Sequence, residues 1–195
     1  REAGVDIDEA ARLVSLIRER ARAAQRRRGG GSGGGSGGSD DERAGGGSAP
    51  QIGAFGAFFE LPPMRRPVLV SSTDGVGTKL EPALAAGRYR EIGRDCVAMC
   101  ANDILCHGAK PLYFLDYLAC GSLDADVAAE IVAGMIDACG EIDCSVSGAE
   151  TAETPGMYAA GTYDVAGFIV GIAEAGRLID GSSVKPGDTL IGIDS

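Results

Sequence analysis

The stretch from Val68 to Lys79, which reads V-L-V-S-S-T-D-G-V-G-T-K, constrains the fold and function of this chain more than any other. Its apolar start predicts a short buried strand over residues 68–72, and two glycines, an acid and a lysine follow. Gly75 and Gly77 lack a Cβ, so the backbone there can adopt left-handed angles and approach a ligand closely. Because consecutive N–H groups in such a turn form a concave anion site, the stretch predicts binding of a phosphate.

Asp74 and Lys79 extend this prediction to a metal-bound nucleotide. Lys79 supplies a positive charge for a phosphate, and the carboxylate oxygens of Asp74 suit Mg²⁺. The stretch is not a Walker A loop, because Thr78 precedes the lysine, whereas that motif has a serine or threonine after it. The alternative interpretation is a plain glycine turn between two strands, which Asp74 caps.

Composition and charge narrow the class of protein. The chain has 195 residues, of which 45% are hydrophobic, enough for one domain with a sizeable core. Its net charge of −10 argues against a nucleic-acid-binding protein. Residues 1–28 carry a net charge of +3 and the rest −13, which favours either an anionic ligand or partner near the N-terminal segment or a solvated helix face. No apolar run approaches the roughly 18 residues that a membrane span needs.

The six cysteines favour reduced thiols of an intracellular protein over a disulfide framework, because most lie within apolar, patterned segments. Cys96, Cys100, Cys106 and His107 are spaced as C-x3-C-x5-C-H, which matches no common zinc motif. Small buried cysteines explain this cluster better than a zinc site does.

Hydrophobic periodicity predicts a chain in which helices and strands intermix, of the α/β or α+β class. Residues 1–28 are predicted to hold an amphipathic helix, residues 29–50 a flexible Gly/Ser-rich insertion, and residues 51–195 the folded domain. The predicted strands cover residues 68–72, 111–119, 144–147, 164–173 and 189–193, and the predicted helices cover 7–25, 90–106 and 124–139.

Two further groups of polar residues are candidates for a site. Asn102 and Asp103 lie near the end of a largely apolar helix, where a polar pair is costly unless it is used or paired; capping or bridging neighbours is the alternative. Glu150 and Glu153 follow a predicted strand. Their carboxylates could hold Mg²⁺ together with Asp74 and Asp103, or could form an exposed acidic turn.

The motif D-G-V-G-T-K resembles the signature of phosphoribosylformylglycinamidine cyclo-ligases, also called AIR synthetases, of purine biosynthesis. Several other blocks resemble this family in the family's order, and together they cover nearly the whole chain apart from residues 29–50. These blocks are Ala3–Asp8, Ala98–Leu105, Phe114–Tyr117, Gly148–Tyr158 and Asp180–Asp188. Several long blocks in the right order are far more specific than any single motif.

The resemblance implies an α+β domain with a mixed four-stranded sheet and helices on one face. Two copies would join their sheets into a barrel across a homodimer. The implied reaction is ATP-dependent ring closure of formylglycinamidine ribonucleotide to aminoimidazole ribonucleotide, with ADP and phosphate released. ATP and Mg²⁺ are the implied cofactors. Neither nucleic acid nor membrane is an expected partner, and the expected compartment is the cytosol, or a plastid if a leader was removed.

The resemblance also implies roles for individual residues. Asp74, Asp103 and Glu150 would bind Mg²⁺, and the catalytic set would be Asp74, Lys79 and Arg18. Arg18 falls where the family usually carries a lysine of the same charge. The implied nucleotide-binding residues are Asp74, Gly75, Gly77, Thr78, Lys79, Asn102, Asp103, Glu150, Thr151 and Glu153.

The sequence departs from the family pattern in three places. Ala149 and Thr154 replace a glycine and a methionine, and the glycine-rich loop is lengthened. The chain also ends at Ser195, where the family continues with a histidine-containing segment and a second α/β domain. We therefore expect the N-terminal half of a longer enzyme, with little catalysis by this half alone.

Two alternatives remain open. The first is a sister ATP-binding enzyme of the same superfamily, such as an amidotransferase synthetase, a selenophosphate synthetase or a thiamine-phosphate kinase. The second is a non-catalytic dimerisation module. Its supporting features are Ala149 and the end of the chain at Ser195. Binding of ATP and Mg²⁺ separates the nucleotide enzymes from the non-catalytic module.

Overall fold

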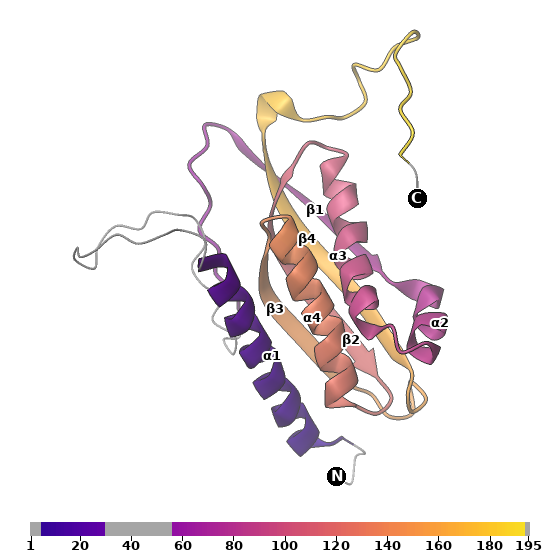
Figure 1. The fold of residues 1–195 in the computed structure, drawn as a ribbon. Coiled ribbons are helices and arrows are strands. Elements are labelled where there is room, and N and C mark those ends of the chain that lie inside the picture. Colours follow the sequence, from indigo (N-terminus) through magenta and orange to yellow (C-terminus); the bar gives the residue numbers. More distant parts are fainter. Residues whose placement is uncertain (1–4, 30–55, 194–195) are drawn as a thin grey trace, which may run out of the picture.

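The computed structural model describes residues 5–29 and 56–193 (Figure 1). The insertion predicted over residues 29–50 lies outside these residues apart from Gly29, so its flexibility stays a prediction. No helix in the described part of the chain is both long and apolar enough to cross a lipid bilayer.

The centre of the fold is a four-stranded mixed sheet, which confirms the predicted α+β class. Its strands are β1 (Pro67–Gly75), β2 (Lys110–Cys120), β3 (Ser145–Glu153) and β4 (Tyr163–Glu174), in the spatial order β1-β4-β2-β3. β4 is antiparallel to both of its neighbours, whereas β2 and β3 run parallel. β1 and β3 are therefore the two edges of the sheet.

The helices lie on one face of this sheet, as predicted (Figure 1). They are α1 (Ile7–Gly29), α2 (Leu80–Ala85), α3 (Tyr89–Leu105) and α4 (Ala125–Glu141). α3 and α4 pack against the sheet and against each other, and α1 packs on α4. The short helix α2 was not expected from the sequence.

The core lies between the sheet and the pair α3 and α4. Alternate residues of β2 and β4 point toward the helices, because successive strand side chains project to opposite faces. The residues that fill this layer are completely or almost completely buried. They include Phe114, Leu118, Val165 and Ile169 from the sheet and Val97, Ile104, Ile131 and Met135 from the helices.

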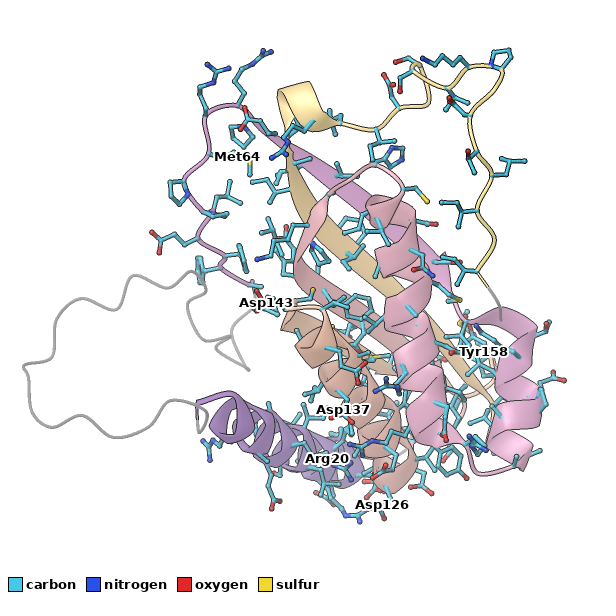
Figure 2. The ribbon with its side chains drawn as sticks, turned by 45° about the horizontal axis from the view of Figure 1, so that its top comes forward. Arg20, Met64, Asp126, Asp137, Asp143 and Tyr158 are labelled. Carbon is cyan, nitrogen blue, oxygen red and sulfur yellow. The ribbon has the colours of Figure 1, made fainter. Side chains whose placement is uncertain are left out.

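Polar residues lie along the contact between α1 and α4. Arg12 donates two hydrogen bonds, of 2.8 and 2.7 Å, to the carboxylate of Asp126, and Arg20 lies 2.7 Å from Glu130. Arg20 and Asp126 mark this contact in Figure 2. The arginines of the N-terminal segment that contact α4 therefore act at least partly as docking residues for α1.

Three element predictions differ from the structure. β3 was predicted to end at residue 147 but runs to Glu153, so Glu150 and Glu153 lie in a strand and not in a turn. β1 likewise continues to Gly75. The strand predicted over residues 189–193 is wrong, because this segment pairs with no described strand and Leu190 is 98% exposed.

Candidate functional site

The glycine stretch forms a tight turn at the end of β1. Gly75 ends the strand, and residues Gly77–Lys79 form a single turn of 3-10 helix that leads into α2. Gly77 has φ of +72°, the left-handed conformation expected for it. The backbone N–H of Val76 donates a 2.8 Å hydrogen bond to the carbonyl of Val165, which fastens the turn to β4.

Asp74 and Asp103 lie on the same side of β1. Ser72 faces α3, because its hydroxyl donates a 2.5 Å hydrogen bond to Oδ2 of Asp103. Asp74 follows two residues later on the strand and therefore shares this face. Its Oδ1 accepts a 2.8 Å bond from the N–H of Gly75. These bonds engage one oxygen of each carboxylate, and the other oxygen of each is the candidate metal ligand.

The thiol of Cys100, on α3, lies near both carboxylates. Burial raises its pKa to about 11, and the charges of Asp74 and Asp103 add to this shift. Both acids therefore act on one thiol from the same neighbourhood. A thiol with so high a pKa stays protonated at neutral pH, so Cys100 is not a candidate nucleophile.

Lys79 lies beside the same helix. Its ammonium nitrogen is 3.1 Å from Oδ2 of Asp95 and 3.3 Å from the sulfur of Met99. The helical spacing puts Asp95 and Met99 one turn apart, so one face of α3 holds the lysine. Neither residue was predicted to belong to a site, because their contact with Lys79 depends on how α3 crosses the end of β1.

The remaining residues predicted near this turn are also exposed. Thr78 lies within the 3-10 turn, and Asn102 lies on α3 beside Asp103. We call the residues gathered here the β1-edge group. They are Asp74, Gly75, Gly77, Thr78, Lys79, Asn102 and Asp103.

Glu150 lies at the opposite edge of the sheet. It pairs with Tyr117 of β2 and faces away from the helices. β4 and β2 separate its strand from β1, a span of roughly 14 Å at the usual spacing of strands. Among the described residues no three His, Cys, Asp or Glu side chains are placed to hold one metal ion. The set Asp74, Asp103 and Glu150 is therefore not assembled within one chain, because its members lie on two edges.

Glu153, at the end of β3, is engaged through both of its carboxylate oxygens. Oε1 accepts a 2.9 Å hydrogen bond from the N–H of Leu123, and Oε2 accepts a 2.7 Å bond from the N–H of Asp6. Glu153 thus joins the start of α1 to the segment that leads into α4. Thr151, two residues before it, pairs with the buried Leu118 of β2.

Arg18 lies on α1 and is exposed. Helix α1 lies at the β3 side of the helical layer (Figure 1). Helices α4 and α3 lie between α1 and the turn that precedes α2, which carries Lys79. We call Arg18, Glu150, Thr151 and Glu153 the β3-edge group. The residues predicted to form one site therefore fall into two groups, at the two ends of the strand order.

The face of the sheet that carries no helix is apolar and partly exposed. Leu69, Tyr117 and Phe168 on this face are 54%, 44% and 38% exposed, respectively. A cavity of about 720 Å³ lies on this face, lined by residues from Leu69 on β1 to Glu150 on β3 and by the segment 56–61. A second cavity, of about 960 Å³, lies between α1, α2 and the start of α4, and no predicted site residue lines it.

Asp116 was missed by the sequence analysis as a special residue. It is the buried acid of β2, and neither carboxylate oxygen has a hydrogen-bond partner among the described residues. Burial raises its pKa to about 7. Its signal in the sequence is an acid at an inward position of an otherwise apolar strand, F-L-D-Y.

A protein-family model described as AIR synthase related protein, N-terminal domain, matches residues 60–173. The chain belongs to this family. A phosphoribosylformylglycinamidine cyclo-ligase of Clostridium botulinum (strain Loch Maree / Type A3) is 49% identical over 195 residues, 100% of this chain and 53% of the relative. The enzyme of that name from Clostridium tetani (strain Massachusetts / E88) is 48% identical with the same coverage. The chain spans about half the length of the curated relatives it matches.

Solved structures support the fold of this family member. The thiamine-monophosphate kinase of Stenotrophomonas maltophilia K279a superposes with a TM-score of 0.57 at 20% identity, over 84% of this chain and 43% of that chain. The hydrogenase maturation protein HypE in complex with ATP superposes with a TM-score of 0.52 at 21% identity, over 68% of this chain and 38% of that chain. T. maritima PurL complexed with ATP superposes with a TM-score of 0.51 at 21% identity, over 62% of this chain and 19% of that chain. Similarity at this identity supports the fold alone.

Proposed function

We propose that this chain is the ATP-binding, dimerising half of a phosphoribosylformylglycinamidine cyclo-ligase. The reaction is the ATP-dependent closure of the imidazole ring of formylglycinamidine ribonucleotide, with release of ADP and phosphate. The observation that carries the proposal is the convergence of Asp74, Lys79 and Asp103 where the glycine turn of β1 meets α3. The 49% identity to relatives of that name supports it.

The β1-edge group suits a triphosphate with its metal. Lys79 and the N–H groups of the turn Gly77–Lys79 provide positive charge and donors for phosphate oxygens. The second oxygens of Asp74 and Asp103 form an oxygen donor set that fits Mg²⁺, an ion usually held by one or two carboxylates plus phosphates and water. When bound, Mg²⁺ would neutralise charge on the phosphates.

The part of this chain in the reaction is to bind and orient. Transfer of the γ-phosphoryl group to the formyl oxygen turns a poor leaving group into phosphate, and the neighbouring nitrogen then closes the ring. Such transfers depend mainly on positioning and charge neutralisation. We assign positioning of the triphosphate to the backbone N–H of Gly77, to Thr78 and to Lys79. Gly75, which has no Cβ, leaves room for close approach, and Asn102 supports the metal ligands.

We further propose a homodimer in which the open faces of two sheets meet. This face carries Leu69, Tyr117 and Phe168, whose exposure suits an interface. If the sheets close into a barrel, the β1 edge of one protomer adjoins the β3 edge of its partner. The β3 edge of the partner subunit would then adjoin the β1-edge group, with Arg18 of the partner subunit on the helix side and Glu150 of the partner subunit on the inner side of the barrel. Both edge groups would serve one site.

Titration of the chain with ATP and Mg²⁺ by calorimetry tests the nucleotide site. We expect binding that Asp74→Asn weakens by at least about tenfold, because it removes a charged metal ligand. Glu141→Gln is the control, since Glu141 pairs with Arg94 on the surface, remote from the turn. Absence of binding by a folded chain, or equal binding by Asp74→Asn, contradicts the proposal. ADP release by the full-length protein with formylglycinamidine ribonucleotide tests the reaction itself.

The same titration decides between the cyclo-ligase half and a non-catalytic dimerisation module. A dimer that binds no nucleotide favours the module. We also propose a cytosolic location, the default for purine biosynthesis.

A further inference from the structure

Helix α3 holds the side chain of Lys79 at two points. Oδ2 of Asp95 lies 3.1 Å from the ammonium nitrogen, and the sulfur of Met99 lies 3.3 Å from it. Eight residues after Asp95 on the same helix, Asp103 accepts the 2.5 Å hydrogen bond of Ser72. One face of α3 thus contacts β1 and the turn that follows it through three of its side chains.

The pair of Asp95 and Lys79 contributes little to the stability of the fold. The two side chains are 53% and 45% exposed, and exposed ion pairs are screened by water and salt. A free lysine side chain, in contrast, samples many rotamers, which a ligand must restrict when it binds. The effect that remains for Asp95 is to fix where the ammonium of Lys79 lies.

The donor count of the ammonium group is consistent with such a role. A lysine has three N–H donors, of which Asp95 and Met99 engage two. We propose that Asp95, with Met99, is a positioning residue that holds Lys79 ready to donate its third N–H to a phosphate of the nucleotide. This inference rests on the proposed nucleotide site and adds to it a residue on α3.

The opposite role for Asp95 makes an opposite prediction. A carboxylate beside a phosphate repels it, so a residue that only competed for Lys79 would weaken ATP binding. Its removal would then raise the affinity for ATP. If Asp95 positions Lys79, its removal lowers the affinity even though a negative charge is lost.

Calorimetric titration with ATP and Mg²⁺ separates the two roles. We expect Asp95→Asn to weaken binding about fivefold to tenfold, and Asp95→Glu to restore part of the loss. Glu91→Gln is the matched control, one turn earlier on α3, where Glu91 pairs with Arg88 at 2.7 Å. In a Lys79→Ala background Asp95→Asn should have no further effect, because Asp95 acts through Lys79. Equal or tighter binding by Asp95→Asn overturns the inference. So does an equally large loss of affinity when Asp95→Asn is introduced into the Lys79→Ala variant.

Chemical labelling tests the same contact without nucleotide. The chain has three lysines, at positions 79, 110 and 185, so mass spectrometry can follow each one after a short pulse of an amine-acylating reagent. We expect Asp95→Asn to raise labelling of Lys79 severalfold while labelling of Lys185 stays constant. Unchanged labelling of Lys79 overturns the inference. Failure of the wild-type chain to bind ATP overturns the nucleotide site instead, and labelling still decides whether Asp95 holds Lys79.

Discussion

Ser72 donates a 2.5 Å hydrogen bond to Asp103 and so ties helix α3 to the strand that carries Asp74. The two residues are 31 positions apart in the chain, and their bond fixes the orientation of a carboxylate that we assign to Mg²⁺. A hydroxyl bonded to a charged acceptor is a stronger constraint than a neutral pair.

Ser72→Ala should therefore weaken binding of ATP with Mg²⁺ by about threefold to tenfold, because Asp103 loses the bond that orients it. The thermal midpoint should change little, since the pair is exposed. Ser71→Ala is the control, because Ser71 faces the other side of the sheet, paired with Val170. Calorimetry and thermal unfolding measure the two effects, and equal losses in both variants would argue against this role.

Asp116 should make the stability of the fold depend on pH. The pKa of Asp116 is about 7 in the fold, against 3.8 for an unperturbed aspartate, because burial disfavours the charged form. Between pH 3.8 and pH ~7 the carboxyl of Asp116 is protonated in the folded chain and ionised in the unfolded chain, so unfolding releases a proton. The free energy of unfolding therefore falls as pH rises through this range. The full loss is on the order of 4 kcal/mol above pH ~7.

Asp116→Asn removes this titration. In urea unfolding between pH ~4 and pH ~8 we expect the wild-type chain to lose stability relative to the variant as pH rises, with a plateau at high pH. The readout is the difference between the two curves, so groups that titrate alike in both proteins cancel. Parallel curves would show that the carboxyl of Asp116 finds a partner or water in solution.

Much of the fold could be predicted from the sequence, because α3, α4, β2 and β4 each bury a continuous apolar face with the right period. The C-terminal ends of β1 and β3 could not be predicted from the sequence. Both are polar edge segments, and their strand conformation comes from pairing with β4 and β2. The segment 189–193 shows the reverse case, because its apolar residues predict a strand but no described strand pairs with it.

The candidate site was predictable only in part for the same reason. Asp74 and Lys79 lie in one local turn, so sequence proximity was enough to group them. Asp103 joins them through the packing of α3 on β1, which the apolar pattern suggests but does not specify. Glu150 lies at the far edge because β3 is the last strand in the order, and no pattern in the sequence encodes strand order.

Gly93→Ala should destabilise the contact between α3 and α4. A Cβ at Gly93 would overlap the backbone carbonyl of Ile131, and backbone cannot move aside as a side chain can. We expect a loss of about 2–3 kcal/mol in the free energy of unfolding by urea. Gly140→Ala on α4 is the control, because a Cβ there meets no atom within 4 Å. Since alanine favours helix over glycine by roughly 0.5–1 kcal/mol, this control should be neutral or stabilising.

Phe168→Asp should dissociate the proposed homodimer. Phe168 lies on the open face of β4, opposite Leu115 and Thr73 of the neighbouring strands, so a carboxylate there would be buried without a partner at a sheet-to-sheet interface. We expect the dissociation constant to rise at least about hundredfold, measured by analytical ultracentrifugation. Val184→Asp is the control, because Val184 is 73% exposed and lies outside the sheet.

The same variant tests whether one site needs both protomers. If Glu150 of the partner subunit and Arg18 of the partner subunit complete the β1-edge group, the monomeric Phe168→Asp chain should bind ATP with Mg²⁺ at least about tenfold more weakly than the dimer, although every residue of the group is intact. Circular dichroism establishes that the variant is folded. A folded monomer that binds the nucleotide as tightly as the wild-type dimer would place the whole nucleotide site on one chain, because the β1-edge group would then suffice without the opposite edge.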